Sequence, residues 1–109
     1  MAKNSVLQGT LDLLVLKTLH SCGHIHGYGI ATHIQDVSEK VLRVEEGSLY
    51  PALHRLEQAG LITSTWRTSE TGRRARFYQL TAQGRRELKS EEESWQAVTA
   101  AVARVLQYS

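Results

Sequence analysis

The sequence predicts a mostly α-helical fold with one small β-hairpin and a long C-terminal helix. Three observations support this prediction. Apolar residues recur at helical spacing in three short segments before residue 60. Between residues 61 and 80 the pattern changes to the residue-by-residue alternation typical of a strand, and helical spacing returns after residue 81. The 109 residues suit a single domain.

The first two helices are expected at residues 10–21 and 27–38. Thr10 is expected to cap the first helix, and Gly23 to end it. Two glycines weaken the start of the second helix, so we expect a hydrogen bond from His26 to fix that start.

A connector at residues 39–46 precedes the next helix, and its β-branched run Val41–Val44 allows a short strand. The helix itself is expected at residues 47–59, with Ser48 as its N-cap and Pro51 in its first turn. Gly60 then ends it. Its inward side carries Leu49, Leu53 and Leu56.

Residues 61–66 and 74–80 are expected to form a β-hairpin around a polar turn. Thr81 is then expected to cap a last helix that runs to about residue 106 and spans about 38 Å, longer than the body of the domain. Such a helix packs on another chain or folds back over its own core. Its apolar stripe contains Leu88, Trp95, Val98, Val102, Val105 and Leu106.

Composition excludes several classes of protein. Apolar residues make up 41%, which is typical of a globular chain, and no apolar run approaches the 18 residues of a membrane span. The N-terminus lacks the apolar region of a signal peptide, so we expect a soluble, cytoplasmic protein. A chain this short cannot enclose a large cofactor, and we expect none.

The basic charge is concentrated in one segment. Residues 66–89 carry a net charge of +5, whereas residues 1–65 carry −1 and residues 90–109 carry −2. Most of the basic residues in that segment are arginines, which pair with phosphate in a bidentate geometry. A solvated protein surface is the alternative interpretation of such a stretch.

Three short helices followed by a hairpin is the order of a winged helix-turn-helix, in which the third helix enters the major groove of DNA. We therefore expect residues 1–80 to bind DNA and the 81–109 helix to form a dimer. The exposed side of the 47–59 helix is polar. The predicted DNA contacts are Ser48, Tyr50, Pro51, His54 and Arg55 on that helix, with Arg73, Arg74 and Arg76 on the hairpin.

Four segments of the chain resemble the PadR family of transcriptional regulators. They are GTLDLLVLKTL at 9–19, HGYGIATHI at 26–34, GSLYPALHRLEQAGLI at 47–62 and SETGRRARFYQLTAQGRREL at 69–88. The resemblance covers nearly the whole chain, and the short C-terminal region is similar to the smaller PadR subgroup.

The resemblance implies a bacterial, homodimeric repressor that binds a palindromic operator in double-stranded DNA. It also implies that Tyr50, in the Leu-Tyr-Pro motif, contacts DNA, as do the arginines after Gly72. The dimer is expected to form through the last helix and the partner's first helix. Its predicted interface residues are Leu11, Leu88, Trp95, Val98, Val102, Val105 and Leu106.

Several of these residues have a second interpretation. Tyr50 could pack beside Pro51, and Arg55 could pair with Glu57 or Glu91. Trp95 packs in the dimer interface or lines a pocket for a small aromatic effector, as in some relatives. For Arg85 and Arg86, solvation is as reasonable as contact with phosphate.

Catalysis and metal binding find little support in the sequence. No nucleophile–base set and no glycine-rich phosphate loop is present. His20, Cys22, His24, His26 and His33 are close in sequence, but their spacing matches no usual zinc pattern, and we expect no metal. The alternative to a DNA-binding regulator is a winged-helix module that binds protein, or less favourably RNA.

Overall fold

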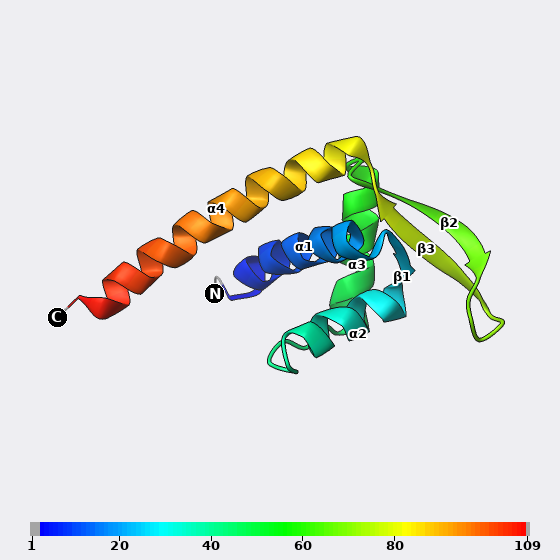
Figure 1. Cartoon of the computed structure of the whole chain (residues 1–109), viewed down its shortest axis with the longest axis horizontal. Coiled ribbons are helices and arrows are strands. Elements are labelled where there is room, and N and C mark those ends of the chain that lie inside the picture. Colours follow the sequence, from blue (N-terminus) through cyan, green and yellow to red (C-terminus); the bar gives the residue numbers. More distant parts are fainter. Residues whose placement is uncertain (1–2, 109) are drawn as a thin grey trace.

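The computed structural model describes residues 3–108, with side chains from residue 9 onward. A small sheet lies at one end of the helices, and α4 and the β2–β3 hairpin extend in opposite directions (Figure 1). The elements are α1 (Lys3–Cys22), β1 (His24–His26), α2 (Gly27–Val37), α3 (Glu46–Gln58), β2 (Ile62–Thr68), β3 (Arg74–Leu80) and α4 (Ala82–Gln107). The predicted fold class, a winged helix-turn-helix with a long C-terminal helix, is confirmed.

The sheet is antiparallel, with strand order β1-β3-β2. The predicted hairpin forms β2 and β3, paired from Ile62 with Leu80 to Thr68 with Arg74. The sequence analysis missed β1, which pairs His24 with Gln79 and His26 with Phe77. The sheet therefore takes its third strand from the α1–α2 connection.

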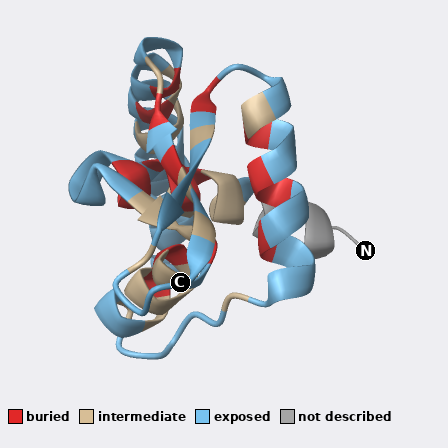
Figure 2. Ribbon diagram, turned by 90° about the vertical axis from the view of Figure 1, so that its right-hand side faces the viewer, coloured by how far each residue is buried: buried red, intermediate tan, exposed pale blue. Residues whose placement is uncertain are grey.

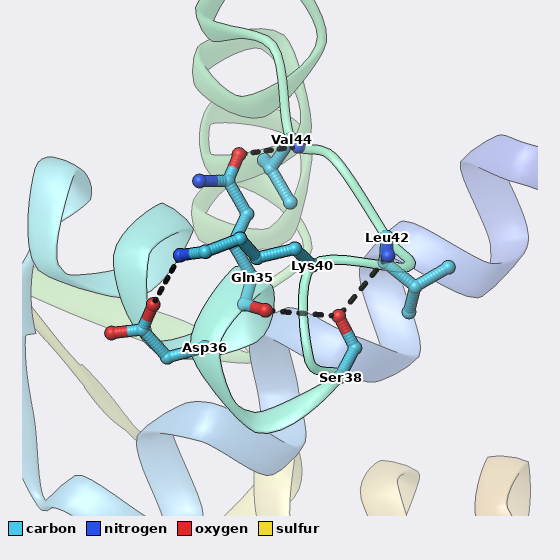
Figure 3. A network of polar contacts seen from close by, with 6 residues as sticks. All are labelled: Gln35, Asp36, Ser38, Lys40, Leu42 and Val44. Carbon is cyan, nitrogen blue, oxygen red and sulfur yellow. Dashed lines mark hydrogen bonds and ion pairs between the residues drawn. The ribbon is translucent and has the colours of Figure 1, made fainter.

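The strand allowed at Val41–Val44 is wrong. The backbone N–H of Val44 donates to the Gln35 side chain (3.1 Å), and that of Leu42 donates to the Ser38 hydroxyl (3.1 Å) (Figure 3). These side-chain acceptors take up two backbone N–H groups that a strand would direct to a neighbouring strand.

Two predicted N-caps are also wrong. Because α1 begins at Lys3, Thr10 lies within that helix. Because α3 begins at Glu46, Ser48 lies in its first turn, and Glu45 occupies the cap position without a side-chain hydrogen bond. The same shift places Pro51 in the second turn rather than the first, where proline lacks the N–H that a helix normally directs to residue i−4.

Four other end signals are confirmed. The N–H of Gly29 donates to Nδ1 of His26 (2.9 Å), which fixes the start of α2 as expected. The N–H of Gly84 donates to the Thr81 hydroxyl (2.9 Å) at the start of α4. Gly23 and Gly60 have φ values of +84° and +78° just after α1 and α3, a conformation that glycine adopts without strain.

One apolar core joins α1, α2, α3, the sheet and the first turns of α4. Leu49, Leu53 and Leu56 face into it as predicted. Figure 2 shows the buried positions gathered where the helices meet the sheet. Leu88 is only 4% exposed, so it packs in the core of the protomer, which leaves little of its surface for the predicted dimer contact. Leu11 also packs, partly buried, against this core.

The second half of α4 lies away from the body. The ion pair between Lys17 and Glu92 (3.3 Å) joins α1 to α4, and every described residue after Glu92 is exposed. Trp95 is 44% exposed and Leu106 is 78% exposed. From Trp95 onward, the apolar stripe therefore does not fold back over the protomer's own core. None of the helices in the described part of the chain has both the length and the apolar character needed to cross a membrane.

Candidate nucleic-acid interface

The outer side of α3 carries a row of exposed side chains. Ser48, Tyr50, Pro51 and His54 are all exposed, because the intervening residues Leu49 and Leu53 occupy the buried side of the helix. The helical period thus presents the predicted contact residues together on one surface. This surface is the first part of the candidate interface.

Tyr50 combines exposure with a close packing contact. It is 45% exposed, and its ring lies against Gly27 at the start of α2. A Cβ at position 27 would come within 2.7 Å of the Tyr50 hydroxyl oxygen, so only glycine permits this approach. This packing on α2 holds the phenol at the edge of the surface.

Arg55 is engaged elsewhere. Its guanidinium donates to Asp12 of α1 (3.1 Å) rather than to Glu57 or Glu91, the two partners that the sequence analysis named. Burial raises the pKa of Asp12, and the Arg55 charge opposes that rise without cancelling it. This pair joins α3 to α1 and holds the Arg55 guanidinium toward α1.

The loop between β2 and β3 forms the tip of the wing. The Ser69 N–H donates to the Arg73 carbonyl (2.7 Å), and the Gly72 N–H donates to the Ser69 carbonyl (2.9 Å). Gly72 has a φ of +84°, which explains glycine at this position. The turn leaves the Arg73 side chain exposed at the tip.

The two faces of the hairpin hold different arginines. On one face, the guanidinium carbons of Arg74 and Arg76 lie 5.6 and 5.7 Å from the centre of the Trp66 ring. On the other face, Arg67 lies 5.3 Å from the centre of the Phe77 ring and contacts the imidazole of His24. Strand alternation produces this division.

The face with Trp66 is continuous with α3. Nε of Arg76 donates to the Ser64 hydroxyl (3.0 Å), and that hydroxyl donates to Glu57 of α3 (2.7 Å). Burial raises the pKa of Tyr78 on the same face; Arg76 opposes the rise, and Glu57 and Tyr50 add to it. These neighbours place the exposed side of α3 next to the Arg76 end of the wing.

Sequence reasoning missed three groups of residues near this surface. Trp66 was assigned only to a strand, although its register with Arg76 follows once the hairpin is aligned. Exposed Lys40 and Arg43 lie in the α2–α3 connection, where Lys40 also approaches Asp36 (3.8 Å) (Figure 3). Exposed Glu45 and Glu46 begin α3 and bring negative charge to that end of the helix.

The histidine and cysteine residues are dispersed over the fold. Sγ of Cys22 and Nδ1 of His33 are 3.8 Å apart, whereas His24 and His26 contact the Phe77 ring. Within residues 9–108, whose side chains are described, no three metal-ligating side chains come together.

Comparison with known proteins agrees with this geometry. Residues 15–90 match the Transcriptional regulator PadR-like family. The chain is similar to Transcriptional regulator Rv3488 from Mycobacterium tuberculosis, with 40% identity over 67 residues, which cover 62% of this chain and 59% of that protein.

Solved structures extend the similarity to almost the full length. A transcriptional regulator from Clostridium thermocellum is 29% identical with a TM-score of 0.81, covering 92% of this chain and 93% of its own. A PadR family transcriptional regulator from Eggerthella lenta is 28% identical with a TM-score of 0.79, covering 99% and 92%. The chain therefore belongs to the PadR-like family of transcriptional regulators, a family of DNA-binding proteins.

Proposed function

We propose that this protein is a homodimeric repressor that occupies a palindromic operator, with α3 in the major groove and the wing along the backbone. The observation that carries the proposal is the joining of two surfaces: the exposed side of α3 and the Trp66 face of the wing are connected through Glu57, Ser64 and Arg76. A groove-reading helix beside a basic hairpin is the arrangement that winged-helix proteins use on duplex DNA.

The charges on this surface assign different contacts to α3 and to the wing. Glu45 and Glu46 at the start of α3 repel phosphates, so the helix is suited to base edges and sugars through Ser48, Tyr50 and His54. Pro51 shapes that part of the helix. The phosphate contacts fall to the wing arginines Arg73, Arg74 and Arg76, with Lys40 and Arg43 on the other side of α3.

The distal half of α4 supplies the dimer contact. Trp95, Val98, Val102 and Val105 follow one another at intervals of three and four residues, which is the spacing of a coiled-coil seam. They are exposed in the protomer, and burying them against a second copy removes apolar surface from water. Binding to successive major grooves requires that this dimer hold its two α3 helices about 34–36 Å apart.

The test is the salt dependence of DNA binding by the variant R73A/R74A. Each phosphate that a cation neutralises contributes about 0.9 to the slope of log affinity against log salt. Losing both arginines should therefore lower the magnitude of the slope by about 1.8 per protomer and weaken binding to every duplex.

A matched control removes the same charge from another region. Arg85 and Arg86 are exposed in the first turns of α4, at the opposite end of α3 from its DNA-facing start (Figure 1). R85A/R86A should change the slope less than R73A/R74A does. Equal slopes for the two variants would contradict the assignment to the wing, and the absence of selective DNA binding by the unaltered protein would favour a protein-binding module.

An effector pocket at Trp95 is the regulatory part of the proposal. The exposed indole and its symmetry mate would offer two flat apolar surfaces to a planar aromatic compound at the dimer seam. Binding there would change the angle between the two DNA-binding halves and so spoil their spacing. Titration of planar aromatic compounds in a Trp66→Phe background should change Trp95 fluorescence, and an unchanged signal would contradict the pocket.

A further inference from the structure

Trp66 is a large aromatic side chain in an unusual position on the wing. It is 57% exposed, and it lies directly across the hairpin from Arg76, with Arg74 two residues further toward the tip. Neither the core nor α3 explains an indole at this site. Its described ring contacts are the guanidinium groups of Arg74 and Arg76, 5.6 and 5.7 Å from the ring centre.

Both distances fall within the range in which a guanidinium is attracted to the face of an aromatic ring. The attraction restrains two long side chains that would otherwise sample many rotamers. Arg76 is restrained a second time by its hydrogen bond to Ser64. Among the described side chains Arg74 contacts the indole of Trp66, without a second hydrogen bond like that of Arg76, so its placement depends more strongly on Trp66.

Two cations on one ring also repel each other, and this repulsion is relieved when an anion approaches both. The other described arginine of the hairpin strands, Arg67, is turned to the opposite face by Phe77 and His24. The wing therefore presents a pair of arginines, restrained in advance, on the same face that is joined to α3. Restraint before binding lowers the entropy lost when a complex forms.

We propose that Trp66 is a positioning residue of the DNA interface, whose indole holds Arg74 and Arg76 ready for two phosphates of the duplex. This inference rests on the proposed function. Trp66 acts through the two arginines and does not itself read bases. Its contribution is therefore independent of DNA sequence.

The first experiment compares three single variants by fluorescence anisotropy on specific and scrambled duplexes. Trp66→Leu should weaken binding to both duplexes about 5- to 30-fold, the combined effect of two exposed cation–π contacts. Trp66→Phe keeps a ring and should recover most of that loss. Thr65→Leu introduces the same leucine at an exposed neighbour on the opposite face and should bind like the unaltered protein.

A double-mutant cycle separates positioning from direct contact. In the R74A/R76A background, Trp66→Leu should cause no further loss, because no guanidinium remains to be held. A loss as large as that in the unaltered background would show that the indole touches DNA itself, and it would overturn the inference while leaving the proposed function intact.

A second measurement needs neither a stable variant nor DNA. In the unaltered protein, the Nε–H resonances of Arg74 and Arg76 should be displaced by the ring current of Trp66. Arg73 at the exposed tip provides the reference. Unshifted Arg74 and Arg76 resonances would overturn the positioning role. Absence of any DNA binding by the unaltered protein would overturn the proposed function and this inference together.

Discussion

Replacement of Glu91 by glutamine should stabilise the protein at alkaline pH and leave its stability at acidic pH unchanged. Glu91 lies on α4 one turn after Glu87 and faces Asp12 of α1. Burial, a hydrogen bond with Glu87 and the negative charges of Glu87 and Asp12 together raise its pKa from 4.5 to about 7. At pH 8, Glu91 is therefore ionised beside the Glu87 and Asp12 side chains at the α1–α4 contact, with Arg55 on Asp12 as the nearby positive charge.

Proton linkage determines the direction in which the stability of the protein changes with pH. A carboxyl whose pKa is raised by folding binds its proton more tightly in the folded state, so its contribution to stability is complete below about pH 4.5 and is lost as the pH rises through about 7. Glu91 is partly exposed, and solvent screening reduces the effect to about 1 kcal/mol. For a chain of 109 residues this corresponds to about 4 °C in Tm.

Urea unfolding followed by circular dichroism at pH 4 and pH 8 measures the effect, at one fixed protein concentration because a dimer couples stability to concentration. Glu91→Gln should raise the free energy of unfolding by about 1 kcal/mol at pH 8 and by nothing measurable at pH 4. Glu93→Gln removes the same charge from an exposed position and serves as the control. The reasoning is refuted if Glu91→Gln changes stability equally at the two pH values, or lowers it at pH 8.

Two further predictions concern packing and assembly. Gly84→Ala should lower the free energy of unfolding by about 1–3 kcal/mol in chemical denaturation, because the added Cβ would overlap the carbonyl oxygen of Leu61. Gly47→Ala places its Cβ in open space and should not destabilise the protein. Equal effects of the two substitutions would contradict the packing argument. W95E/V102E should convert a dimer into a monomer in light scattering, because the seam would bury unpaired charges, and a variant that stays dimeric would refute the role of the stripe.

Structural features that depend only on residues near one another in the sequence could be predicted. Leu49, Leu53 and Leu56 repeat at the helical period, and their burial follows from that spacing alone. Thr81 indicates the start of α4 because its hydroxyl can cap a helix. Gly60 indicates the end of α3 because glycine adopts a positive φ without strain. The hairpin follows from its alternation in the same way.

Features that depend on distant partners could not be predicted. The three residues of β1 are too few to show the period of a strand, and they become one by pairing with β3. The Arg55–Asp12 pair joins residues 43 positions apart, so sequence neighbours such as Glu57 were the wrong candidates. Ser48 has the chemistry of a cap, but α3 begins at Glu46, so the cap position falls on Glu45, three residues earlier than predicted.

The candidate site likewise contains features that the sequence could predict and features that it could not. The exposed row on α3 and the arginines of the wing were visible in the sequence as a period and a charge cluster. The grouping of Arg74 and Arg76 on Trp66, and the link from Arg76 through Ser64 to Glu57, required the register of the hairpin and its position beside α3.

The most direct test of the central claim is fluorescence anisotropy with a labelled duplex from the region upstream of the protein's own coding sequence. A scrambled duplex is measured in parallel at two salt concentrations. A repressor that reads its operator through α3 and holds it through the wing should bind the upstream duplex tightly, prefer it over the scrambled one, and keep that preference at the higher salt. Weak binding that is equal for the two duplexes and disappears with salt would contradict the claim that this surface recognises its own operator.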